Sequence, residues 1–129
     1  MTNFAHLTLP TTQVARTAAF FVEAFGWTYS QAPANVPMEA QWLDIGRGQQ
    51  IHVVYVPNFA TSPFECEFGR HIAVFYPLQD FPALKLRLRE RGAVIVPELR
   101  SVPFERIFFR EPVNGYFFEV IDDARETKA

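Results

Sequence analysis

The stretch RHIAVFY, residues 70–76, decides how the chain is organised, because it restarts a pattern that has already appeared once. It holds five consecutive apolar residues, Ile72 to Tyr76, and we interpret it as a β-strand. The stretch NFAHLTL, residues 3–9, has apolar residues at every second position from Ala5 to Leu9, which is typical of a β-strand, and is ended by Pro10. A predicted helix follows each stretch and stops at a glycine, Gly26 in the first case and Gly92 in the second, 66 positions apart. The first helix is predicted to carry an apolar stripe of Val14, Ala18, Phe21 and Phe25. The chain is therefore predicted to contain an internal repeat.

Each copy of the repeat is predicted to have the order β-α-β-β-β. The first copy has strands at 3–9, 27–30, 40–45 and 49–56 and a helix at 14–25; the second has strands at 70–76, 93–97, 104–110 and 116–121 and a helix at 80–91. Residues 58–68 show no clean period and are interpreted as a linker. One copy of about 60 residues buries too little surface to be more than marginally stable alone. We therefore expect one α+β domain over 1–129, with module one at 1–57, module two at 69–123 and a short C-terminal tail.

The composition excludes several classes of function. The net charge is −2 and the basic residues are scattered, so a nucleic-acid surface is not expected. No apolar run approaches the roughly 18 residues of a membrane span, and the first ten residues lack the pattern of a secretory signal. The single cysteine, Cys66, can form neither an intrachain disulfide nor a cysteine-rich metal site, and we interpret it as incidental. We expect a cytoplasmic protein that binds neither nucleic acid nor membrane.

The three histidines fall at matched positions of the repeat. His6 and His71 lie 65 positions apart, each in the first predicted strand of its copy. His52 lies four residues after a turn glycine, and so does Glu119, 67 positions later. Alternation places all four on the strand face opposite the predicted core. The core face is predicted to carry Ala5, Leu7, Leu9, Ile51, Val53, Tyr55, Ile72, Val74, Tyr76, Tyr116, Phe118 and Val120.

Three imidazoles and one carboxylate that converge from four strands suit a divalent metal ion. Nitrogen and oxygen ligands fit Zn, Ni, Fe, Mn or Co. A cation would also offset the cost of burying ionised Glu119 among aromatic residues. Taken singly, each histidine is more often a hydrogen-bonded packing residue, and Glu119 is often an edge charge. The matched repeat positions and the shared face favour the metal site.

The opening strand FAHLTL, the fifth strand GRHIAVFY and the ending EPVNGYFFEV resemble the vicinal oxygen chelate superfamily. That superfamily includes glyoxalase I, methylmalonyl-CoA epimerase, fosfomycin-resistance proteins, bleomycin-binding proteins and extradiol dioxygenases. The ending is similar to the family's common Asp-Pro-x-Gly-Asn-x-x-Glu turn and strand. The resemblance covers nearly the whole chain and implies two βαβββ modules forming a curved, half-open, barrel-like mixed sheet with helices outside. It also implies a homodimer.

The resemblance further implies a divalent metal ion as cofactor, held by His6, His52, His71 and Glu119. The implied function is a metal-dependent glyoxalase-like enzyme, of lyase or isomerase type, that polarises a small-molecule substrate through vicinal oxygens. Glu119 is then also the nearest candidate for the catalytic base. One alternative is an Fe(II) extradiol-type dioxygenase, in which His52 is an acid–base residue. The other is a non-catalytic drug-binding resistance protein of the bleomycin-binding type, although such relatives generally lack the ligands.

The sequence departs from the family pattern in three places. His52 stands where glyoxalase I-like proteins generally place Glu, which argues against glyoxalase proton transfer. The turn that begins at Glu111 is one residue longer than usual and has Glu in place of Asp, a change that we expect to be harmless. No potassium loop or thiol-binding signature of the fosfomycin type is present, so we rank that activity low. Three arginines are interpreted either as charges for an anionic substrate or as solvent-facing strand residues: Arg100, Arg106 and Arg110.

Overall fold

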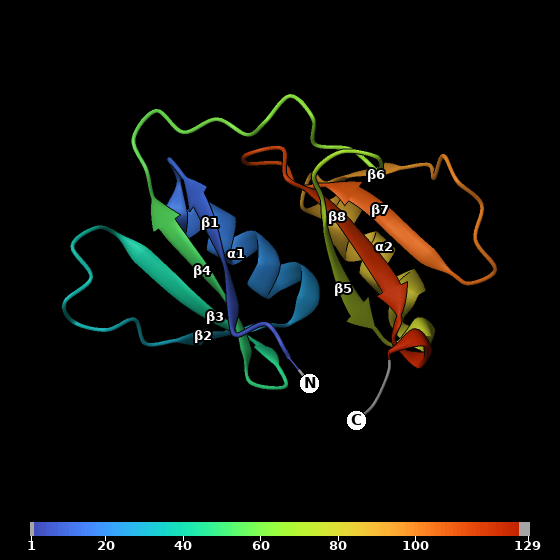
Figure 1. Ribbon diagram of the computed structural model, residues 1–129, viewed down its shortest axis with the longest axis horizontal. Coiled ribbons are helices and arrows are strands. Elements are labelled where there is room, and N and C mark those ends of the chain that lie inside the picture. The colour runs from blue at the N-terminus through green and yellow to red at the C-terminus, as the bar shows by residue number, and fades with distance from the viewer. Residues whose placement is uncertain (1, 127–129) are drawn as a thin grey trace. The chain divides into compact units, whose positions relative to one another are not determined.

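The computed structural model describes residues 2–126 of the chain (Figure 1). The chain separates into two compact units, Met1–Ala60 and Thr61–Ala129, and each has its own sheet and its own helix. The boundary between the units lies after Ala60, inside the segment interpreted as a linker. None of the helices within 2–126 is long and apolar enough to cross a membrane.

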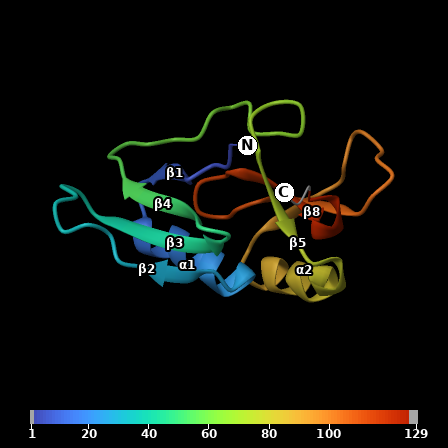
Figure 2. The same ribbon diagram turned by 60° about the horizontal axis from the view of Figure 1, so that its bottom comes forward.

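Unit 1 is a four-stranded mixed sheet with one helix on one face (Figure 2). Its elements are β1 (His6–Thr11), α1 (Val14–Phe25), β2 (Thr28–Ser30), β3 (Ala40–Gly46) and β4 (Gln49–Tyr55). The strand order is β1-β4-β3-β2, with β1 parallel to β4 and the other pairs antiparallel. The crossover from β1 to β4 includes the helix, as a parallel connection requires.

Unit 2 repeats this topology. Its elements are β5 (Ile72–Tyr76), the short 3-10 helix η1 (Leu78–Asp80), α2 (Phe81–Glu90), β6 (Val94–Val96), β7 (Arg106–Arg110), β8 (Phe117–Asp122) and the 3-10 helix η2 (Asp123–Arg125). The strand order is β5-β8-β7-β6, again with a single parallel pair, β5 and β8. The predicted α+β class with two βαβββ modules is confirmed.

The helix of each unit covers the apolar face of its sheet. In unit 1 the stripe predicted on α1 is buried, and Phe21 has no exposed surface. Gly26 ends α1 in the left-handed conformation, with φ of 75°, which glycine adopts at little cost. In unit 2, α2 buries Leu84 and Leu88. The sheet residues buried on these faces are Leu9, Leu43, Ile51, Val53, Ile107, Phe109, Phe118 and Val120.

Three local predictions differ from the structure. Pro10 does not end β1, which continues to Thr11. β1 lies at the edge of its sheet, where a missing backbone N–H is tolerated. Ala5 precedes β1 and is exposed, and Tyr55 at the end of β4 is 39% exposed, so neither belongs to the core. His71 lies one residue before β5 rather than inside it.

The segment predicted to be a linker contains no helix or strand, yet part of it is packed into unit 2. Glu65 and Glu67 are both buried. The carboxylate of Glu65 accepts hydrogen bonds from the Arg70 guanidinium at 3.0 Å and the Phe117 backbone N–H at 3.4 Å. Apolar periodicity could not reveal this packing, because acidic side chains and backbone groups make the contacts.

The turn before β8 is closed by a side chain. Both carboxylate oxygens of Glu111, which is 1% exposed, accept backbone N–H groups. The donors are Val113 at 2.8 Å, Asn114 at 2.7 Å and Tyr116 at 3.2 Å. Glu111, which stands in place of the family's aspartate, therefore stabilises the turn directly. This turn places β8 in register with β7.

Candidate metal centre

Unit 1 brings His6 and His52 into direct contact. Both side chains belong to the sheet face that α1 leaves uncovered, His6 at the start of β1 and His52 in the middle of β4. Their rings are stacked, with centroids 3.9 Å apart and planes 19° apart. Trp42 lies directly across from His52 on β3 and stacks on its other side at 3.8 Å. His52 is therefore held between two rings.

The stack and one hydrogen bond define the chemistry of His52. Its Nε2 lies 2.8 Å from the Gln50 side-chain oxygen, which can only accept, so Nε2 carries the proton. Burial, followed by the charge of His6, lowers the pKa of His52. The ring is therefore neutral near pH 7, and its Nδ1 keeps a lone pair, as a metal ligand or a base requires.

Unit 2 brings His71 and Glu119 together. Glu119 is in the middle of β8 and is 7% exposed. Its Oε1 lies 3.2 Å from Nε2 of His71. The other ring nitrogen of His71, Nδ1, is buried and has no hydrogen-bond partner, the only such side-chain atom found within 2–126. A histidine placed only for packing would ordinarily satisfy that atom, because leaving it unpaired costs about 1–3 kcal/mol.

The spacing of this pair fits two ligands of one ion. Donor atoms that each bind an ion at about 2.1 Å, at angles between 90° and 109°, lie about 3.0–3.4 Å apart. The observed 3.2 Å falls inside that range. A carboxylate oxygen and an imidazole nitrogen are also the donor types that Mn, Fe, Co, Ni and Zn accept. His71 and Glu119 therefore fit a divalent cation by both spacing and chemistry.

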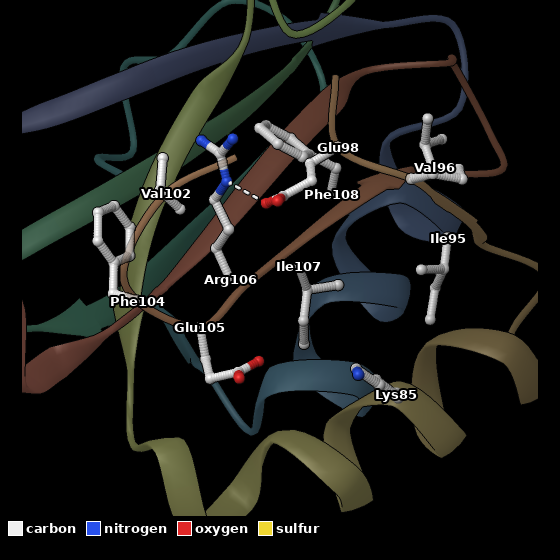
Figure 3. A pocket seen from close by; sticks show the side chains of 11 residues that line it. Lys85, Ile95, Val96, Glu98, Val102, Phe104, Glu105, Arg106, Ile107 and Phe108 are labelled. Carbon is white, nitrogen blue, oxygen red and sulfur yellow. Dashed lines mark hydrogen bonds and ion pairs between the residues drawn. The ribbon is translucent and has the colours of Figure 1, made fainter. Parts of the chain in front are cut away.

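The oxygen of Glu119 that faces away from His71 belongs to a buried charge network. Arg106 on β7 donates from Nη1 to Glu119 Oε2 at 3.0 Å, and its side chain is only 3% exposed. It also donates from Nε to Glu98 at 3.0 Å (Figure 3) and from Nη2 to Glu67 at 3.3 Å. Burial tends to lower the pKa of Arg106, but its hydrogen bonds to Glu98 and Glu119 outweigh this and raise it. Arg106 is therefore neither solvent-facing nor free to bind a substrate anion.

Glu67 anchors this network from the predicted linker. Its carboxylate accepts the backbone N–H groups of Leu99 at 2.7 Å and Arg100 at 3.0 Å. Burial tends to raise the pKa of Glu67, but these two bonds and the charge of Arg106 outweigh it, and the pKa is lowered. Sequence reasoning missed Glu67 and assigned Arg106 to other roles. The available signal was the two acidic residues of ECEF, residues 65–68, in a segment whose apolar residues show no periodicity.

Arg110 differs from Arg106 in its surroundings. It lies on the same face of β7, and its guanidinium is 5.1 Å from the centre of the Phe117 ring. Its hydrogen bonds go to the backbone carbonyls of Gly115 at 3.2 Å and Glu65 at 3.0 Å. Among the residues that the structure describes, no carboxylate pairs with it. Its positive charge therefore remains available on the face that carries Glu119, and its role toward a substrate stays a prediction.

An apolar wall surrounds the unit 2 pair. The rings of Phe108 and Phe117 stack at 5.4 Å, and both meet the His71 ring edge-on at 5.8 and 6.3 Å. Phe108 is the cross-strand partner of Glu119. Both phenylalanines are 2% exposed. They strengthen electrostatic interactions at the pair by keeping water away from it.

The predicted ligands therefore form two pairs, one in each unit. Within residues 2–126 no group of three or more His, Cys, Asp or Glu side chains is gathered as one set of ligands. The prediction that the two pairs share a single ion, and the choice of Glu119 as a base, stay predictions.

The sequence matches the family model of the Glyoxalase/Bleomycin resistance protein/Dioxygenase superfamily over residues 3–120. The chain belongs to this superfamily. The resemblance to the vicinal oxygen chelate proteins is thereby confirmed. No curated protein matches the sequence.

Solved structures of fosfomycin resistance proteins share the fold of this chain. FosX from Listeria monocytogenes is 18% identical, with a TM-score of 0.76, over 94% of this chain and 91% of that one. FosX from Mesorhizobium loti is 17% identical, with a TM-score of 0.73, over 94% and 91%. A mutant of the Listeria protein, 17% identical with a TM-score of 0.78 over 95% and 92%, was solved with Mn(II) and 1S,2S-dihydroxypropylphosphonic acid. At this identity the likeness demonstrates a common fold.

Proposed function

We propose that the chain is a metal-dependent enzyme that binds a small anionic substrate through two adjacent oxygens at one divalent cation. His6, His71 and Glu119 would hold the cation, with His52 as a fourth ligand. The observation that carries the proposal is the His71–Glu119 pair: a buried carboxylate oxygen and Nε2 of an imidazole lie 3.2 Å apart, the spacing of two donors to one ion. The Mn(II) bound by a FosX relative supports a divalent cation in this fold.

The cation would supply Lewis-acid polarisation of a substrate oxygen. The chain supplies the surroundings. Arg106 holds Glu119 at Oε2 and so fixes its orientation, while Phe108 and Phe117 keep water from the pair. Of the two roles predicted for Glu119, these contacts support the role of ligand, because Arg106 fixes the carboxylate through Oε2 and leaves Oε1 beside Nε2 of His71.

The charge of Arg110 supports an anionic substrate. Two backbone carbonyls and the Phe117 ring hold its guanidinium in place without neutralising it. A guanidinium can bind a carboxylate, phosphate or phosphonate group through two parallel hydrogen bonds. The phosphonate in the FosX relative belongs to this class of ligand. We therefore propose that Arg110 binds the substrate anion.

One observation favours an Fe(II) dioxygenase as the second candidate. Gln50 holds Nε2 of His52 at 2.8 Å. This contact leaves Nδ1 as the nitrogen of His52 with a lone pair, and if Nδ1 accepts protons instead of binding the cation, the ligands that remain are His6, His71 and Glu119, two histidines and one carboxylate. Such a set leaves open positions on Fe(II) for oxygen and a catechol, and His52 would then act on protons. The non-catalytic drug-binding alternative is the least supported of the three, because the chain keeps the donor set.

Elemental analysis and turnover test this proposal together. Protein stripped of metal is loaded anaerobically with Mn, Fe, Co, Ni or Zn, and bound metal per chain is counted. We expect close to one ion per chain. Loaded protein is then assayed on 2-oxoaldehyde–thiol adducts, acyl-CoA epimers, fosfomycin with water, and catechol with oxygen. Turnover of catechol with Fe alone would select the dioxygenase. Absence of bound metal in every preparation would end the proposal in both forms.

A further inference from the structure

Arg106 is surrounded by more negative charge than it neutralises. Its guanidinium bonds to the carboxylates of Glu119, Glu98 and Glu67, and also to the backbone carbonyl of Arg100. The side chains of Glu119 and Glu67 are only 9% and 5% exposed, whereas that of Glu98 is 40% exposed. Buried charges persist only when they are paired and hydrogen-bonded. Arg106 is therefore the cation that allows Glu119 to be buried as a carboxylate.

The two oxygens of Glu119 have separate partners. Oε2 accepts from Nη1 of Arg106 at 3.0 Å, and Oε1 faces Nε2 of His71 at 3.2 Å. A carboxylate can bind a metal ion through one oxygen or through both. A guanidinium bonded to Oε2 competes directly with an ion for that oxygen. The contact thus decides which oxygen is available.

We propose that Arg106 is a positioning residue that reserves Oε1 of Glu119 for the cation and prevents binding through both oxygens. This inference rests on the proposed function. Arg106 touches neither substrate nor cation in this role; it acts through Glu119. The second carboxylate oxygen would otherwise occupy a position on the cation that a substrate with two adjacent oxygens needs.

Glu67 and Glu98 reduce the electrostatic repulsion between Arg106 and the proposed cation. A bare guanidinium one carboxylate away from a divalent cation would repel it, because like charges interact strongly where water is excluded. Glu67 and Glu98 bond to the two guanidinium nitrogens that do not bond to Glu119. Together they leave Nη1 of Arg106 as a rigid hydrogen-bond donor to Glu119, with the guanidinium charge offset. A lysine at this position could not bond to three carboxylates in one plane, because its ammonium is a point charge.

Arg106 also lines a cavity of about 350 Å³ that lies beside β6 and β7. Figure 3 shows Glu98 and Arg106 together at one side of it, with Phe108 close by. The cavity gives the half-exposed Glu98 access to water. Glu98 is therefore the one member of the network that can be altered at little risk to folding.

The test uses Co(II), whose visible d–d bands change in position and lose intensity as more ligand atoms bind. Wild type, Arg106→Lys and the matched control Arg110→Lys are loaded with Co(II), and thermal unfolding of each is recorded. Arg110 lies on the same strand face, two residues on the other side of Phe108, but has no carboxylate partner in the described structure. We expect weaker bands in Arg106→Lys alone. We also expect its Co(II) affinity to fall by about 10- to 100-fold, the effect of losing a residue that orients a ligand.

A spectrum and affinity equal to wild type in folded Arg106→Lys would overturn the inference and leave Arg106 as a packing residue. If that variant does not fold, Glu98→Gln takes its place. It is expected to weaken Co(II) binding about two- to fivefold, the range of one half-exposed ion pair, and wild-type binding would overturn the inference. Failure of wild type to bind Co(II) or any other ion is a different result, because it removes the proposed function as well.

Discussion

His52 and Glu119 occupy the same place in the two sheets, yet their neighbours differ in charge. Each faces an aromatic ring across the strand pair, Trp42 in unit 1 and Phe108 in unit 2. On either side of that ring lie Ala40 and Asp44 in unit 1, and Arg106 and Arg110 in unit 2. The repeat has thus kept the scaffold and changed the charges. Unit 1 offers two stacked imidazoles, whereas unit 2 offers an imidazole, a carboxylate and two guanidinium groups.

Because of this difference, we expect unit 2 to contribute more than unit 1 to the binding of the proposed cation. His6 and His52 are held by ring contacts and one amide hydrogen bond, so their orientation can change at little cost. Glu119 sits in a network that spans four charged side chains, three of them nearly buried. We expect unit 2 to supply most of the affinity for the proposed cation and substrate anion.

The largest expected effect tests that asymmetry directly. Glu119→Gln should weaken Mn(II) binding by more than about 100-fold, because altering residues that merely orient ligands already costs about 10- to 100-fold. His52→Gln should weaken it by less than about tenfold on the same scale. Isothermal titration calorimetry measures both, with circular dichroism as the control for folding. Equal losses of affinity would show that the two units contribute equally to Mn(II) binding and would refute the expected asymmetry.

The turns before β8 and β4 also differ between the units, because a buried carboxylate closes the first and glycines form the second. Glu111→Ala should lower the free energy of unfolding by about 2–4 kcal/mol, because three backbone N–H groups lose their acceptor and that of Tyr116 is buried. The corresponding turn of unit 1 rests on Gly46 and Gly48, both with positive φ, around Arg47. Arg47→Asn, which also tolerates positive φ, should change the free energy by less than about 0.5 kcal/mol. Urea denaturation compares them, and similar values for both would refute the distinction.

The third prediction concerns the matched positions Arg110 and Asp44. In Mn(II)-loaded protein, Arg110→Met should raise the dissociation constant of methylphosphonate about tenfold, which corresponds to one charge-assisted hydrogen bond. Asp44→Asn also removes one charge, of opposite sign, in unit 1, where the carboxylate accepts a hydrogen bond from Gln50 at the surface. It should leave that constant within about twofold. A larger effect from Asp44→Asn would place the anion in unit 1 instead.

The smallest effect is a difference in acid sensitivity. The pKa of Glu67 is lowered in the folded protein, so its contribution to stability is present above the ordinary glutamate pKa and is lost as the pH falls through the lowered value. Glu67→Gln should therefore flatten the loss of stability between about pH 5 and pH 3. Asp44→Asn serves as the unit 1 control. Urea denaturation over this range measures the slopes, and an unchanged slope in Glu67→Gln contradicts the prediction.

Most of the fold could be predicted from the sequence, because the spacing of apolar residues indicates where its helices and strands lie. Strand alternation, the stripe on α1 and the stops at Gly26 and Gly92 are local signals, and each element is found within a few residues of its predicted place. Pro10 misled the prediction because proline is allowed at a sheet edge, and the edge is known only once the strand order is known.

The candidate site could be predicted in part. The parity of His52 and Glu119 followed from alternation, and the structure confirms the register of both strands. Arg106 and Glu67 could not be paired from the sequence, because 39 positions separate them and their bond depends on how a segment without regular structure folds back. Long-range polar contacts leave no periodic trace, and those contacts set the charge around Glu119.

The stacking of Trp42 on His52 gives the protein an optical reporter of its own. The chain has two tryptophans, and the other, Trp27, packs at 4.5 Å against Phe25 of α1. Only Trp42 shares a stack with an imidazole, at 3.8 Å. Any event that reorients or charges that imidazole should alter indole fluorescence from Trp42 while Trp27 remains constant. Occupancy of the histidine pair can therefore be followed by light emission, without a label.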